Sequence, residues 1–97
     1  MERPKFNLGF VVCTSSIDEM MVEDSQFKSF VNDTLLNKYM LGDWGDTCQE
    51  DAKTNDDAIK NGDDRILAVY KYNSKITIWI ITELDRSVTT ILFPDEY

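Results

Sequence analysis

The residues that could do chemistry fall in two segments of this sequence. Residues 43–64 are rich in carboxylates. In residues 82–90 (TELDRSVTT), a turn with acidic and basic side chains is followed by several serine and threonine hydroxyls. The sequence contains no histidine, no Gly-rich phosphate loop, no nucleophile elbow and no metal-ligand set. We therefore expect no metal and no cofactor.

The first segment (DWGDTCQEDAKTNDDAIKNGDD) contains eight carboxylates against two lysines, Lys53 and Lys60. Such a segment repels phosphate backbones and attracts basic protein surfaces. Direct nucleic-acid binding is therefore disfavoured, and a basic protein surface is the expected partner. The candidate partner-binding residues are Asp43, Trp44, Asp46, Glu50, Asp51, Asp56, Asp57, Asp63 and Asp64. The alternative is a solvated helix face with no binding role.

Trp44 stands between two Gly-Asp steps in the stretch LGDWGD, residues 41–46. Interface hot spots are enriched in tryptophan, so Trp44 could anchor a partner. It could equally cover the core where helices meet the sheet. Gly42 and Gly45 suit a helix end and a sharp turn, and Asp43 or Asp46 could cap the next helix. The pattern leaves both roles of Trp44 open.

The second segment suggests a small nuclease as the alternative function. An arginine, threonines and a glutamate at one sheet edge could position a phosphodiester and stabilise its developing charge. This site would comprise Arg65, Thr82, Glu83, Arg86 and Thr89, with Glu83 as a possible base. The simpler interpretation is a charged hairpin turn, because neighbouring carboxylates disfavour a bound phosphate.

The periodicity predicts one α+β domain over residues 1–97, ordered β-α-α-α-β-β-β, with helices packed on an antiparallel sheet. We expect a first strand at 6–13 and a helix from a capping box at Ser16 and Glu19. A second helix should follow Asp24 or Ser25, and a third should run from about 46 to 60 and end at Asn61-Gly62. Strands are expected at 65–72, 75–83 and 87–93, the last ended by a proline.

Composition limits the broad class. The net charge is −8, and the hydrophobic fraction of 42% is typical of a folded domain. No apolar run is long enough to span a bilayer, and the first residues lack the pattern of a secretory signal. Cys13 and Cys48 have no metal-site spacing, so we expect reduced cysteines and a cytoplasmic location.

Three stretches carry a resemblance: LNKYMLGDWGD, EDAKTNDDAIKNGDDRIL and IWIITELDRSVTTILFPDEY. They resemble a family of small proteins of bacterial conjugative elements, plasmids and prophages, labelled plasmid-related protein or type I restriction modification subunit. The likeness covers nearly the whole chain, and its last twenty residues are the most specific part. Members often have a histidine where this chain has Tyr39, a departure that weighs against a catalytic base.

The resemblance implies a mobile-element protein. In that setting, the acidic segment favours an inhibitor of a host defence protein, of the anti-CRISPR or anti-restriction type. Restriction and CRISPR effectors hold nucleic acid in basic channels, which an acidic surface can occupy by electrostatic complementarity.

Overall fold

Four strands form one mixed sheet in the computed structural model, which describes residues 4–97. They are β1 (Phe10–Cys13), β2 (Ile66–Lys71), β3 (Thr77–Thr82) and β4 (Val88–Leu92), in the spatial order β1-β4-β3-β2. The predicted α+β class and element order are confirmed. The sheet is not wholly antiparallel, because β1 runs parallel to β4. The helical segment after β1 supplies the long crossover that a parallel neighbour requires.

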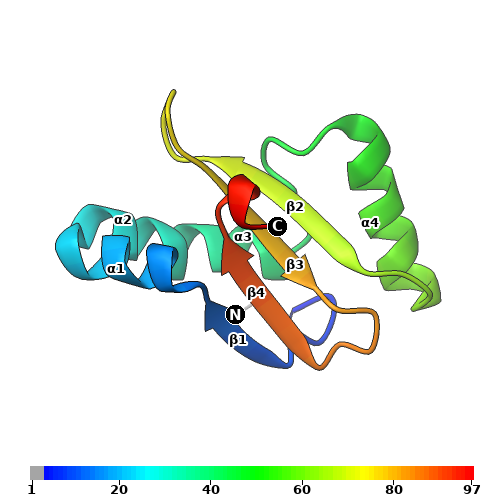
Figure 1. Ribbon diagram of the computed structural model, residues 1–97. Coiled ribbons are helices and arrows are strands. Elements are labelled where there is room, and N and C mark those ends of the chain that lie inside the picture. Colours follow the sequence, from blue (N-terminus) through cyan, green and yellow to red (C-terminus); the bar gives the residue numbers. More distant parts are fainter. Residues whose placement is uncertain (1–3) are drawn as a thin grey trace.

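Helices cover one face of this sheet. They are α1 (Ser15–Glu23), α2 (Ser25–Ser29) and α3 (Leu36–Met40), and the π-helical stretch η1 (Phe30–Leu35) joins the last two (Figure 1). Asp24 caps α2 as predicted, since its carboxylate accepts from two backbone amides of the first turn. Thr14 caps α1 in place of the predicted Ser16, because the chain leaves its last contact with β4 at Thr14.

The core lies between these helices and the sheet. Its apolar helix residues repeat at three- and four-residue spacing, as the pattern predicts. The fully buried members of this row are Phe27, Val31, Leu35 and Tyr39. They face the inward rows of the three C-terminal strands, which include Ile66, Ala68, Tyr70, Ile78, Ile80 and Ile91.

A fourth helix, α4 (Gln49–Asn61), lies beside β2, at the opposite edge of the sheet from β1 (Figure 1). Gly62 ends it with a φ of 68°, in the left-handed region, as predicted. The helix begins at Gln49 and not near residue 46, because the preceding residues pair with β2.

The second face of the sheet is less covered. The C-terminal turn η2 (Pro94–Glu96) is followed by Tyr97, whose ring contacts Trp79 at a centroid distance of 5.6 Å. Pro94 follows the end of β4, as expected for a residue that cannot donate to the ladder. Within residues 4–97, no helix has both the length and the apolar character to cross a bilayer.

Candidate functional site

The turn between α3 and α4 covers the outer edge of β2. Gly45 makes a parallel bridge with Val69, and the Asp46 amide donates to the Val69 carbonyl at 2.9 Å. The Asp46 carboxylate accepts from the Lys71 amide, and the Thr47 hydroxyl accepts from the Val69 amide, both at 2.8 Å. This edge strand therefore has partners for its outward backbone groups, which blocks addition of another strand.

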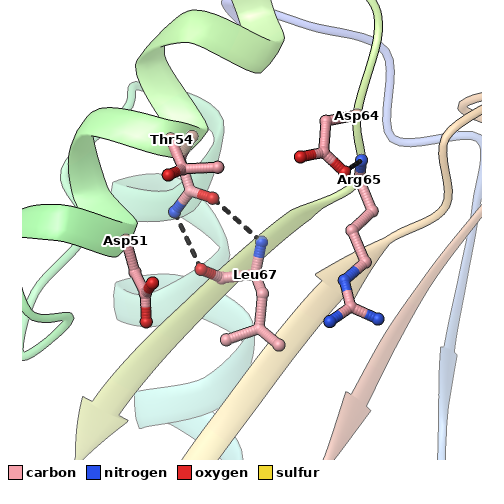
Figure 2. Close-up of a pocket in the computed structure, with 6 residues that line it drawn as sticks. Asp51, Thr54, Asp64, Arg65 and Leu67 are labelled. Atoms are coloured by element: carbon pink, nitrogen blue, oxygen red, sulfur yellow. Dashed lines mark hydrogen bonds between the residues drawn. The ribbon is translucent and has the colours of Figure 1, made fainter.

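Asn55 of α4 completes this cover. Its side-chain amide donates to the Leu67 carbonyl at 2.8 Å, and its Oδ1 accepts from the Leu67 amide at 3.1 Å, as the dashed lines in Figure 2 show. Only 2% of Asn55 is exposed, so a buried polar side chain holds α4 against the sheet edge. In the sequence, this contact is indicated only by a polar residue on the buried side of a helix. Periodicity alone does not identify the partner of such a residue.

Trp44 lies in the core. It is 7% exposed and packs against the rings of Phe6 and Tyr39, with centroid distances of 6.2 and 5.7 Å. Its indole N–H donates to Asp56 Oδ1 at 2.8 Å. Of the two roles that the sequence left open, the structure places Trp44 in the structural one, and Asp56 is its hydrogen-bond partner.

The eight carboxylates predicted to bind a partner all belong to exposed residues. They follow one another along the β2 side of the molecule, in the turn before α4, in α4 and in the loop after it. We call this group, Asp43, Asp46, Glu50, Asp51, Asp56, Asp57, Asp63 and Asp64, the acidic edge.

Several members of the acidic edge also have structural partners. Asp43 accepts from the Gly45 amide at 3.1 Å, and Asp64 accepts from the amide of the next residue at 2.7 Å. In the described part of the chain, the single ion pair is Lys53–Asp57, with an N–O distance of 3.9 Å. Basic side chains of the same molecule therefore leave most of this negative charge uncompensated.

A groove of about 430 Å³ lies between α4 and the start of β2. It is lined by Asp51, Thr54, Asn55, Asp64, Arg65 and Leu67. Figure 2 shows Asp51 projecting from α4, with Asp64 and Arg65 across from it. The Arg65 guanidinium bonds to the Tyr97 hydroxyl and lies 5.5 Å from the centre of that ring. The groove thus combines two carboxylates with one cation, which a neighbouring aromatic ring already holds.

The residues of the alternative nuclease site do not share an open surface. Thr82 and Thr89 are fully buried, and their hydroxyl oxygens lie 2.7 Å apart. Thr89 also donates to the Leu8 carbonyl at 2.7 Å. Their assignment as phosphodiester ligands is therefore corrected: both hydroxyls face the core, whereas Glu83 and Arg65 are exposed at the surface.

Arg86 also has a structural position. Its terminal nitrogens donate to four backbone carbonyls, those of Ala58, Asp64, Glu83 and Leu84, at 2.8–3.3 Å. One of these carbonyls lies in the last turn of α4, where a cation complements the helix dipole. The side chain therefore ties the β3–β4 hairpin to the end of α4, and it is not presented as a free anion-binding group.

Tyr39 connects α3 to the buried threonines. Its hydroxyl lies 2.7 Å from Thr82 Oγ1 and 3.3 Å from the Ile66 carbonyl, to which it donates. Burial raises the pKa of Tyr39 well above its ordinary value, and the Thr82 hydrogen bond opposes this rise more weakly. The hydroxyl therefore remains protonated near neutral pH, as a structural donor.

Removing this hydroxyl should destabilise the domain. We expect Tyr39→Phe to lower the free energy of unfolding by about 1–2 kcal/mol, because buried oxygens lose a partner. Urea denaturation followed by fluorescence measures the change. The matched control is Tyr72→Phe, since the Tyr72 hydroxyl makes no hydrogen bond to any residue in 4–97. Equal losses in both variants would contradict the proposed role of the Tyr39 hydroxyl.

No protein-family model, curated protein or solved structure matches the chain. Within residues 4–97, no group of three or more His, Cys, Asp or Glu side chains is arranged to hold a metal ion. The acidic edge is therefore the feature from which we argue function.

Proposed function

We propose that this chain is a non-enzymatic interaction protein whose acidic edge occupies a cationic, nucleic-acid-binding groove of another protein. The observation that supports this proposal is the distribution of charge. Eight exposed carboxylates lie along the β2 side, and among residues 4–97 a single ion pair compensates them. A field of this kind attracts basic surfaces and speeds encounter with them.

The spacing of the charges favours one kind of groove. The 13 residues of α4 span about 20 Å, and four carboxylates of the acidic edge lie on this helix. A DNA duplex of that length carries about 12 phosphates, and a single strand carries about 6. The helix is therefore closer in charge density to a single strand, and we propose a channel that holds one strand as the target.

The resemblance to mobile-element proteins directs this proposal to host defence. A restriction or CRISPR effector has a basic channel for a displaced or guided strand, and an inhibitor that occupies the channel protects incoming DNA. Trp44 does not act as the anchor in this proposal. Through Asp56 it holds α4 against the core, so that the helix presents its charge from a fixed position.

A charge-reversal pair tests the proposal. Asp57→Lys combined with Asp63→Lys alters two exposed carboxylates near the C-terminal end of α4, where cations are compatible with the helix dipole. We expect the double variant to need about tenfold more protein to release labelled single-stranded DNA from purified restriction or CRISPR effectors, given about 0.5–1 kcal/mol per exposed charge pair. The wild-type effect should weaken as salt is added.

The control carries the same change of charge elsewhere. Glu19→Lys combined with Glu23→Lys alters exposed residues of α1, at the far end of the molecule from α4 (Figure 1). This variant should release DNA as the wild type does, and both variants should unfold at similar urea concentrations. The proposal fails if the wild type releases no DNA from any effector tested, or if both variants lose activity equally.

A further inference from the structure

The strand β1 forms the other edge of the sheet, and no helix or strand lies along its outer side in the described part of the chain (Figure 1). Phe10 and Thr14 direct their amides to carbonyls around β4. The alternating residues Val11 and Cys13 therefore turn their backbone N–H and C=O groups outward. Among residues 4–97, these outward groups have no hydrogen-bond partner.

The side chains of β1 are also largely exposed and apolar. The exposed fractions of Phe10, Val11 and Val12 are 81%, 43% and 44%. Edge strands are usually protected by charge, proline, a bulge or a covering segment, and the sequence FVVC offers neither charge nor proline. The chain thus covers its β2 edge with side chains and leaves an apolar β1 edge open.

We propose that β1 pairs with β1 of a second copy of this chain, antiparallel, about a two-fold axis at Val12. In this register Val11 of each copy lies opposite Cys13 of the other. These are the residues whose backbone groups point outward, so the pairing satisfies all of them at once. Phe10 lies on the open face of the sheet and comes opposite Thr14 of the second copy, where it packs diagonally against that copy's Val12.

Symmetry favours a second copy as the occupant, and the acidic edges lie too far apart to oppose it. About a two-fold axis, the outward N–H and C=O groups of Val11 and Cys13 in one copy meet the same groups of the other copy. A strand of another protein would need unpaired groups in a matching register. Three strand spacings, about 14 Å, separate β1 from β2 within one copy. The acidic edges of the two copies would lie roughly 33 Å apart, well beyond the Debye length of about 8 Å at physiological salt. The pairing therefore leaves both acidic edges free.

The closer charges oppose this pairing moderately. The helix α1, which follows β1, carries Asp18, Glu19 and Glu23. Like-charge repulsion between the copies should weaken the dimer at low salt, and added salt should strengthen it. This salt dependence is opposite in sign to the one expected for the acidic edge, so a failure of either proposal can be distinguished from a failure of the other.

Disulfide trapping tests the register. In a Cys13→Ser, Cys48→Ser background, Val12→Cys would place two thiols at the two-fold axis. Facing residues in such a non-hydrogen-bonded pair have Cα atoms about 4.5 Å apart, within disulfide range. The control is Val11→Cys in the same background, where the two Cα atoms would lie roughly 8 Å apart, beyond that range.

We expect mild oxidation to convert the Val12→Cys variant to a dimer on a non-reducing gel and to leave the Val11→Cys variant monomeric. No cross-link at Val12, or equal cross-linking at both positions, would overturn the proposed pairing. Val11, Val12 and Cys48 are exposed and Cys13 is half-buried, and each substitution introduces a small side chain, so circular dichroism should show an unchanged fold.

Sedimentation of the unmodified chain provides a second measurement. A four-residue strand buries less than the roughly 800 Å² per partner of a standard interface, so we expect a weak dimer with a dissociation constant of roughly 100 μM. Val12→Lys would place two cations opposite each other and should weaken the dimer at least tenfold, while the DNA-release activity stays unchanged. A wild-type chain that remains monomeric at roughly 1 mM would contradict the proposal.

Discussion

Replacing Gly45 by alanine is expected to lower the free energy of unfolding by about 2–4 kcal/mol. The φ of Gly45 is 58°, so any Cβ at this position is strained. An added Cβ would also lie 2.4 and 2.7 Å from two ring atoms of Tyr70. That ring is 2% exposed, and its hydroxyl donates to the Asp43 carbonyl at 2.8 Å, so it cannot turn away without losing this bond.

Gly62→Ala is the matched control for this substitution. Its φ of 68° imposes similar backbone strain, but an added Cβ would meet nothing within 4 Å. We expect a loss of about 1 kcal/mol from strain alone. Chemical denaturation of the two variants measures the difference, which isolates the contact with Tyr70. Similar losses in both variants would show that the turn shifts to accommodate the Cβ. The contact with the Tyr70 ring would then not be the reason for glycine at position 45.

Arg86→Ala is expected to cost about 2–3 kcal/mol, because four carbonyls lose a charged donor that joins the β3–β4 hairpin to α4. Arg86 has a φ of 61°, but alanine and arginine both carry a Cβ, so the substitution adds no new backbone strain. Thermal and urea denaturation measure the loss. Because the hairpin and the helix share this contact, amide exchange should rise in both elements together.

Arg65→Ala is the control for the loss of a positive charge. The Arg65 side chain is exposed, and among residues 4–97 its hydrogen bond and its cation–π contact are both to Tyr97, so its removal should cost less than about 1 kcal/mol. An Arg86→Ala variant that unfolds at the wild-type urea concentration would refute the structural role. If that variant also lost an RNA-cleaving activity present in the wild type, the nuclease interpretation would replace ours.

Local chemistry predicted much of this fold. The three C-terminal strands begin and end within two residues of their predicted limits, because β-branched runs bounded by turn residues mark strands. Asp24 and Gly62 act at the helix ends as their side chains and backbone freedom suggested. The first strand starts at Phe10 and not at Phe6, because the Asn7 side chain accepts from the Gly9 amide and turns the chain first.

Long-range contacts decided what the pattern left open. The parallel pairing of β1 with β4 joins residues nearly eighty positions apart, and no local period encodes it. Trp44 is buried in part by Phe6, which precedes the first strand. Thr82 and Thr89 have ordinary strand propensity, and only the β3–β4 register, which pairs them, brings their hydroxyls together and places that of Thr82 beside Tyr39. The acidic edge was predictable because exposed carboxylates need no specific neighbour.

The residues that cover the edge of β2 and the carboxylates of the acidic edge belong to one segment of the chain. Asp46, Thr47 and Asn55 shield the strand, and the carboxylates around them face solvent. If this segment detached, the unpaired backbone groups of β2 would be exposed, and the protein would aggregate through this strand. Solubility therefore reports whether this segment is still in place. A substitution that abolishes partner binding while the protein remains soluble has changed the binding surface itself and has not detached the segment that carries it.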